Sequence, residues 1–176
     1  LPIWKRYQNK LRKIGYTISN IGRRESGKHP ALVGLAEVEN AIAIEDLINS
    51  KHLENCNYEF VHFDSLDERG IDVALLYDTT AFEVLHTEVF TVELIKPNGS
   101  PDYTRDILLV SGLLDGEKVH LIVNHWSSRR EGQLETEFKR IASSDKANAI
   151  ITSIKEKNED AKIIVMGDFN DNPSSE

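Results

Sequence analysis

The sequence contains few of the residues that build disulfide-stabilised, fibrous or membrane-spanning proteins. Cys56 is the single cysteine in 176 residues, which excludes an internal disulfide and a cysteine-based zinc site. Ten glycines and five prolines are too few for a collagen-like or low-complexity chain. No apolar run approaches the roughly 20 residues that cross a bilayer, so we predict no membrane span. A globular fold remains, and the cellular compartment stays undecided.

Positive charge is also scarce. The chain has 21 Lys and Arg against 29 Asp and Glu, a formal net charge of −8, so its average surface repels nucleic acids and anionic membranes. A polyanionic partner would therefore need a local basic patch. A chain of 176 residues suits one domain better than two, so we treat residues 1–176 as a single domain. No obligate protein partner is indicated.

Hydrophobic periodicity predicts the first elements. Apolar residues recur at three- and four-residue steps over residues 3–21, which predicts an amphipathic helix. The apolar run 31–35 predicts a strand buried on both faces. Asn40 is a suitable cap for a second helix at about 41–50.

The rest of the chain is richer in strands. Turn residues separate runs that predict a meander of antiparallel strands: 58–60, 71–77, 82–92, 105–114 and 119–123. A long amphipathic helix follows, with Leu134, Phe138 and Ile141 at the start of its apolar stripe, and then a last buried strand over 163–166. This order of elements predicts an α/β sandwich in which helices cover β-sheets.

Clusters of polar side chains follow three of the predicted strands, at residues 37–40, 124–130 and 167–173. Strand ends are common places for functional sites. Taken alone, Glu37 could be solvated or cap the next helix, and His125 could be a structural histidine. The third cluster begins like a calcium-binding EF-hand loop, but Pro173 stands where that loop needs glycine, so we exclude an EF-hand.

Together the clusters supply the side chains that a phosphoester site needs. Mg²⁺ or Mn²⁺ is held by oxygen ligands, often one or two carboxylates, which makes Glu37 a candidate metal ligand. Asn170, His125 and a nearby arginine offer donors to phosphoryl oxygens. Asp168 could orient an imidazole or position the attacking water.

Four segments then follow one another in a defined order: residues 35–40 (LAEVEN), 69–77 (RGIDVALLY), 124–130 (NHWSSRR) and 167–171 (GDFND). In sequence and order they resemble successive motifs of the endonuclease/exonuclease/phosphatase superfamily, which has the DNase I-like fold. The resemblance extends over the whole chain. It implies a four-layer α/β/β/α sandwich that hydrolyses phosphoester bonds with a divalent cation, usually Mg²⁺.

The resemblance also implies roles for individual residues. Glu37 matches the metal-ligand glutamate, and His125 matches the strand-end histidine that contacts the scissile phosphate. Asp168 and Asn170 match the pair that positions water and phosphate. We therefore expect these four side chains to converge on one cleft.

Weaker matches concern substrate binding. Arg105 resembles the family's phosphate-facing arginine, and Arg129 and Arg130 are candidates for a basic rim beside His125. Trp126 could stack on a base or sugar, or pack in the core. Asp72 could orient a catalytic histidine, and the alternative is a structural role within its strand.

Two features of the family are missing from the sequence: an asparagine on a strand before the opening helix, and a C-terminal Ser-Asp-His segment that supplies a metal-linked aspartate and the general base. We therefore expect residues 1–176 to be about the middle two thirds of the domain and inactive alone. The leading hypothesis is a phosphodiesterase or nuclease. The alternatives are a phosphatase or phospholipase-type enzyme acting on phosphoinositides, sphingomyelin-like lipids or small phosphate esters, and a noncatalytic binding domain that keeps the fold.

Overall fold

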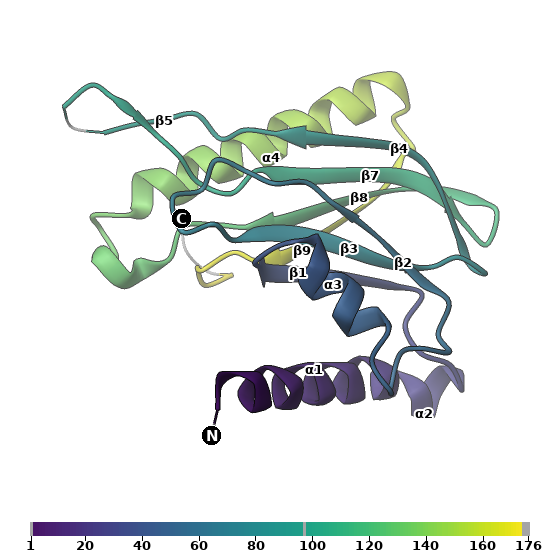
Figure 1. The fold of residues 1–176 in the computed structure, drawn as a ribbon. Helices are drawn as coiled ribbons and strands as arrows, with labels where there is room; N and C mark the ends of the chain where they lie inside the picture. The colour runs from purple at the N-terminus through teal and green to yellow at the C-terminus, as the bar shows by residue number, and fades with distance from the viewer. Residues whose placement is uncertain (1, 97, 174–176) are drawn as a thin grey trace.

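Helices cover both outer faces of two stacked β-sheets in the computed structural model of the chain, which describes residues 2–96 and 98–173 (Figure 1). The strands are β1 (Leu32–Val38), β2 (Tyr58–His62), β3 (Asp72–Asp78), β4 (Phe82–Phe90), β5 (Leu94–Ile95), β6 (Pro101–Asp102), β7 (Ile107–Leu114), β8 (Glu117–His125) and β9 (Lys162–Asp168). The helices are α1 (Ile3–Asn20), α2 (Arg23–Ser26), α3 (Ala41–Ile48), α4 (Glu137–Lys157) and a 3₁₀ turn at Arg129–Glu131. None of the described helices has the length and apolar character to cross a membrane.

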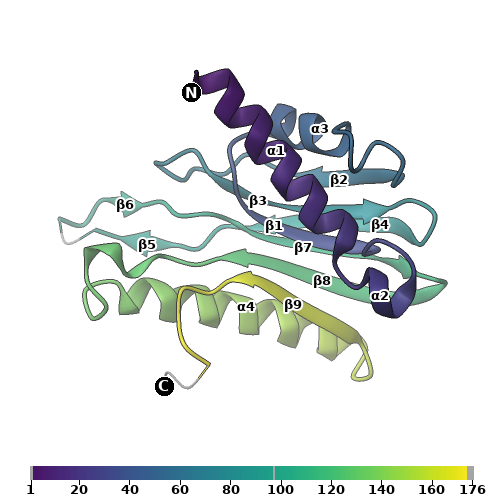
Figure 2. The same ribbon diagram turned by 90° about the horizontal axis from the view of Figure 1, so that it is seen from below.

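Alternating side chains create a separate apolar layer on each side of each sheet. One sheet has the order β1-β3-β2 and the other β4-β7-β8-β9, and β5 pairs with β6 in a small hairpin. On β7, Leu108 and Val110 pack between the sheets, whereas Ile107 and Leu109 face α4. Helices α1 and α3 cover the outer face of the three-stranded sheet, which Figure 2 shows from below. The predicted four-layer sandwich is confirmed.

Two connections position the strands that end at the polar clusters, a tight turn and a long helical crossover. Asp115 and Gly116 both have positive φ, as a two-residue turn between β7 and β8 requires, and the aspartate–glycine pair suits it. From β8 the chain returns through α4, so that β9 pairs parallel to β8. The carboxyl ends of both strands therefore lie at the same end of the sheet, with His125 opposite Asp168.

Several expectations need correction. The predicted meander is divided between two sheets, because β3 pairs with β1 and β2 while β4 begins the other sheet. Strands β1 and β9 lie at sheet edges instead of being fully buried, and Ile164 and Val165 of β9 are 42% and 38% exposed.

Helix α4 also differs from the prediction. Its expected apolar residues Leu134, Phe138 and Ile141 are exposed, while Arg140 is buried. The Arg140 guanidinium bonds to Asp171 and Thr136, so that the first turns of α4 direct a polar side chain inward. Farther along, Ala147 and Ile150 form the buried face. The predicted cap of α3 is confirmed, since the Asn40 side chain accepts a hydrogen bond from the Ala43 amide at 2.9 Å.

Candidate active site

His125, Asp168 and Asn170 are held together by the paired ends of β8 and β9. The Trp126 amide donates to the Asp168 carbonyl at 2.8 Å, and Asn170 Nδ2 donates to the Trp126 carbonyl at 3.0 Å. Asp168 Oδ1 accepts a bond from the Asn170 amide at 2.9 Å, which closes a tight turn. These bonds join two segments that lie more than 40 residues apart in the sequence.

Gly167 is what allows this close approach. Its φ of +138° is unfavourable for any residue with a side chain, and a Cβ here would lie 1.9 Å from the carbonyl oxygen of Asn124. The neighbouring atom belongs to the backbone of a central strand and cannot move aside. Glycine in the Gly-Asp-Phe-Asn segment is therefore required for Asp168 to lie beside His125.

Glu37 is placed by a bulge near the end of β1. Between the pairs Leu35–Ala74 and Val38–Asp72, β1 advances three residues while β3 advances two. A bulge redirects the side chains beside it, and Glu37 has a φ of 58°, in the left-handed region. The strain at this non-glycine residue costs on the order of 1–3 kcal/mol, a pattern that is typical of functional sites. The Glu37 carboxylate is exposed and lies 3.6 Å from Arg69 Nη2.

His125 lies within the electrostatic influence of both carboxylates. Its side chain is buried, and among the described residues its Nδ1 has no hydrogen-bond partner. Burial lowers the pKa of His125, and Arg105 lowers it further, whereas Asp168 and Glu37 act to raise it. Burial dominates, so the ring is neutral near pH 7. The structure thus brings Glu37, His125, Asp168 and Asn170 to one end of the sandwich.

Arg105 does not have the exposed position that a phosphate ligand needs. Its guanidinium donates to the carbonyls of His125 at 3.0 Å and Trp126 at 2.5 Å, and it forms a buried ion pair with Asp67 at 3.1 Å. Three of its five N–H donors are used within the protein, so the structure favours a supporting role for Arg105, and the phosphate-facing role stays a prediction. Arg105 supports the turn that carries His125. The sequence patterns do not single out Asp67, its partner 38 residues away.

The two arginines after His125 differ from each other. Arg129 donates to the Asn170 carbonyl at 2.9 Å and pairs with Asp171, so it braces the turn after β9. Arg140 pairs with the same carboxylate at 2.7 Å. Arg130 is exposed and has no partner among the described residues, so it alone of the two remains available to a substrate.

Two further candidates are explained by packing. Trp126 contacts Phe169 edge to face, with ring centroids 4.9 Å apart, and its Nε1 donates to Asn124 Oδ1. Its ring is therefore part of the core instead of a stacking platform. Asp72 accepts bonds from Ser65 and pairs with His62, so it does not orient His125, and the structural alternative applies to it.

A groove of about 400 Å³ begins beside the His125 turn. Its walls include the loop at Arg69, the segment at Tyr103 and Thr104, and Arg130. Tyr103 is 41% exposed, whereas Thr104 is buried and its hydroxyl has no partner among the described residues. The groove therefore offers an aromatic face and the Arg130 guanidinium, beside acidic side chains.

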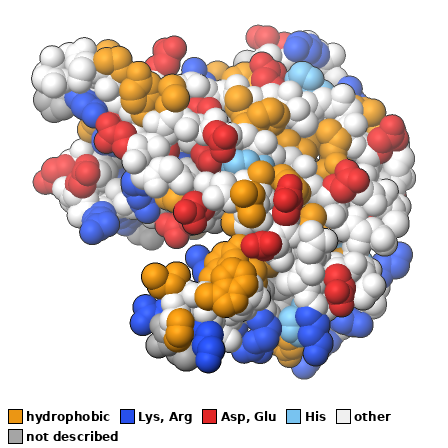
Figure 3. Space-filling model, in the orientation of Figure 1, with side chains coloured by type: hydrophobic (Ala, Val, Ile, Leu, Met, Phe, Trp, Pro, Cys, Tyr) orange, Lys and Arg blue, Asp and Glu red, His pale blue; other side chains and the backbone are white. Residues whose placement is uncertain are grey.

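Charge is unevenly distributed over the molecule. The first 24 residues contain no Asp or Glu, and the basic side chains of α1 are all exposed: Lys5, Arg6, Lys10, Arg12 and Lys13. In Figure 3, blue side chains gather along α1 and α2, while red ones are spread over the sheets above. The chain therefore contains a strongly basic helix, α1, although its net charge is −8.

Solved structures of other proteins share this fold. The chain is similar to an endonuclease/exonuclease/phosphatase from Bacteroides vulgatus, with 19% identity, a TM-score of 0.66, and coverage of 97% of this chain and 60% of the other. The human Nocturnin catalytic domain with bound sulfate is 16% identical with a TM-score of 0.66, and the match covers 94% of this chain and 59% of that one. Danio rerio TDP2 with a single-stranded DNA product is 17% identical with a TM-score of 0.60, and the match covers 93% of this chain and 56% of that one. The chain thus spans little more than half of these solved chains.

The sequence comparisons give the family. A search of curated proteins finds no match. The sequence model of the Endonuclease/Exonuclease/phosphatase family matches residues 3–176, nearly the whole chain, and agrees with the predicted resemblance. The matched residues include the two-sheet fold and the polar ends of β1, β8 and β9, and the chain belongs to the endonuclease/exonuclease/phosphatase family.

Proposed function

We propose that the protein is a metal-dependent phosphoester hydrolase, and within that class a phosphodiesterase or nuclease that uses Mg²⁺ or Mn²⁺. One observation carries the proposal: the paired ends of β8 and β9 hold His125 beside Asp168 and Asn170, and Glu37 is near enough to influence the pKa of the His125 ring. Metal-assisted hydrolysis of a phosphoester uses carboxylates that hold a cation and nearby hydrogen-bond donors that bind the phosphate.

Glu37 is the residue that would hold the cation. Its carboxylate is 62% exposed, and its only ion-pair partner among the described residues is Arg69 at a loose 3.6 Å. A hard cation needs only one or two carboxylates and keeps several waters, so this donor fits. The bound ion would neutralise phosphate charge and polarise a phosphoryl oxygen.

The remaining residues would act on the phosphate and the water. Asn170 Nδ2 uses one N–H for the Trp126 carbonyl, which leaves its second N–H for a phosphoryl oxygen. The neutral His125 ring can donate one hydrogen bond to the same group. The Asp168 carboxylate, exposed beside them, would accept a proton or hydrogen bond from the attacking water. Arg105 acts as a positioning residue, because it holds the backbone that carries His125.

The groove supports a substrate with more than one phosphate. Arg130 is free to bind a flanking phosphate, and Tyr103 presents an aromatic face to a base. A neighbour of similar fold was solved with a single-stranded DNA product, which makes single strands a reasonable first substrate.

A small phosphate ester is the second candidate. Lys139 in the groove is already paired with Asp102 at 2.9 Å, and Glu68 and Glu131 also line it. These acidic side chains reduce the affinity for a long polyanion. They affect a single phosphate much less.

The experiment is hydrolysis by the intact protein of single-stranded and duplex DNA, RNA, a phosphoinositide, sphingomyelin and p-nitrophenyl phosphate. Each is measured with Mg²⁺, with Mn²⁺ and with chelator. Cation-dependent cleavage of nucleic acid supports the nuclease proposal. Turnover of the small esters alone favours the second candidate, and no turnover of any substrate favours the noncatalytic alternative.

A further inference from the structure

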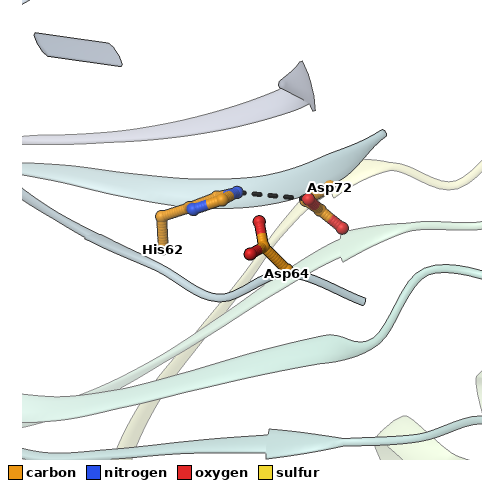
Figure 4. A group of neighbouring side chains, drawn as sticks. All are labelled: His62, Asp64 and Asp72. Atoms are coloured by element: carbon orange, nitrogen blue, oxygen red, sulfur yellow. Dashed lines mark hydrogen bonds and ion pairs between the residues drawn. The ribbon is translucent and has the colours of Figure 1, made fainter. Parts of the chain in front are cut away.

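A second group of metal-ligand side chains lies on β2, β3 and the loop between them. A ring nitrogen of His62 and carboxylate oxygens of Asp64 and Asp72 all lie within 4.8 Å of one another. Figure 4 shows the Asp64 carboxylate turned toward the His62–Asp72 pair. We propose that this group, here the His62 cluster, is a second cation site that binds a borderline divalent ion such as Zn²⁺, separate from the site at Glu37.

The spacing within the pair is that of two ligands on one ion. His62 Nε2 lies 3.2 Å from Asp72 Oδ2, and the two side chains are only 4% and 7% exposed. This separation is at the long end of the range for an N–H···O hydrogen bond, about 2.7–3.2 Å. Two vertices of a tetrahedron around Zn²⁺ lie about 3.3 Å apart when the bonds are about 2.0–2.1 Å. Little movement of this buried pair is needed to receive the ion.

The surroundings of Asp72 prepare it as a ligand. The Ser65 amide at 2.9 Å and the Ser65 hydroxyl at 2.6 Å both donate to Asp72 Oδ1, which fixes the carboxylate and leaves Oδ2 directed at His62. Hydrogen bonds of this kind orient ligands at metal sites. Asp64 is exposed, and among the described residues it has no hydrogen-bond or ion-pair partner, so its carboxylate is available as the third ligand.

Negative charge accumulates around this cluster. Asp106 and Asp72 line the same small hollow, so a third carboxyl group lies beside Asp72 and its charge repels that of Asp72. A divalent cation would relieve this repulsion.

The donor set selects the kind of ion. Mg²⁺ and Ca²⁺ prefer all-oxygen sites, whereas an imidazole nitrogen with two carboxylates suits Zn²⁺ or Mn²⁺. Asp72 pairs in register with Val38, the residue after Glu37. An ion here would join β2, the following loop and β3 beside the strand that carries Glu37, so binding should stabilise this end of the sheet.

A matched control exists in another histidine–aspartate pair. His29 Nε2 lies 2.9 Å from Asp78 Oδ2, and no third metal-ligand side chain of the described residues is close enough to complete a site there. His29→Gln removes one histidine of the same chemistry and leaves the His62 cluster intact. Asp64→Asn removes the third ligand from an exposed position, so the fold should survive it.

The test is calorimetric titration of chelator-treated intact protein with Zn²⁺, followed by Co²⁺ absorption spectra. We expect wild type and His29→Gln to bind equally, Asp64→Asn to bind at least about tenfold more weakly, and Glu37→Gln to keep the site. Thermal unfolding in chelator checks that the Asp64 variant is folded. Equal affinity for Asp64→Asn, loss of the site in Glu37→Gln, or no Zn²⁺ binding at micromolar concentration would each overturn the proposal. Because no readout involves hydrolysis, the result is independent of the proposed enzymatic function.

Discussion

Replacing Arg105 with methionine is the most informative perturbation of the site's support. The substitution keeps an unbranched side chain of similar length and removes the charge. It leaves the Asp67 carboxylate, whose side chain is 4% exposed, without its cation. It also removes the donors to the carbonyls of His125 and Trp126.

The expected loss of stability is large. Removal of one partner from a buried ion pair costs about 3–5 kcal/mol, because the other charge stays buried without compensation. The two lost carbonyl bonds lie in the same network and do not add independently. For a chain of this length, we expect the melting temperature to fall by on the order of 10 °C.

Urea unfolding of four variants beside the wild type measures this loss: Arg105→Met, Asp67→Asn, the two combined, and Arg130→Met. Arg130→Met is the matched control, because Arg130 is exposed, and it should change stability by less than about 0.5 kcal/mol. Asp67→Asn combined with Arg105→Met should lose less than the sum of the single changes, with a coupling of about 0.5–3 kcal/mol. Near wild-type stability for Arg105→Met, with only weaker substrate binding, would refute the positioning role and restore the phosphate-facing one.

Two further predictions concern Gly167 and His125. A Cβ at residue 167 would lie 1.9 Å from a backbone oxygen, so Gly167→Ala should destabilise the protein by more than about 2 kcal/mol in urea unfolding. The control Gly70→Ala, at φ +61° in open space, should cost only about 1–2 kcal/mol. Equal losses for the two variants would contradict the packing argument. Because burial lowers the pKa of His125, the unfolded chain binds this proton more readily, and stability should fall as the pH drops below about 6.5. His125→Gln should make the stability profile between pH 5 and 7 flatter, and an unchanged slope would show that the ring titrates normally.

Local sequence patterns predicted the elements and the polar strand ends well. Runs of strand-forming residues between turn residues marked the core strands, and Asn40 marked the start of α3, because strand preference, turns and capping depend on near neighbours. The polar segments after β1, β8 and β9 were also visible. Their convergence is a consequence of strand order and direction, since β8 and β9 are parallel neighbours.

What local patterns missed depends on distant partners. The inward face at the start of α4 follows from the pairing of Arg140 with Asp171, and the burial of Arg105 follows from Asp67. Neither pairing has a signature in the spacing of residues. The bulge that directs Glu37 also has no sequence signature. Ala36 and Glu37 have no unusual local preference, and the extra residue is recognised only when β1 is paired with β3.

The most direct test of a cation-dependent phosphoester site is the metal dependence of hydrolysis by the intact protein carrying Glu37→Gln. Glu39→Gln is the matched control, since Glu39 is also exposed, lies two residues after Glu37, and loses the same charge in this variant. We predict that Glu37→Gln lowers the rate at limiting Mg²⁺ at least about tenfold and raises the Mg²⁺ concentration needed for half-maximal activity, whereas Glu39→Gln leaves both unchanged. Undiminished hydrolysis by Glu37→Gln at limiting Mg²⁺ would contradict the assignment of Glu37 as the metal ligand.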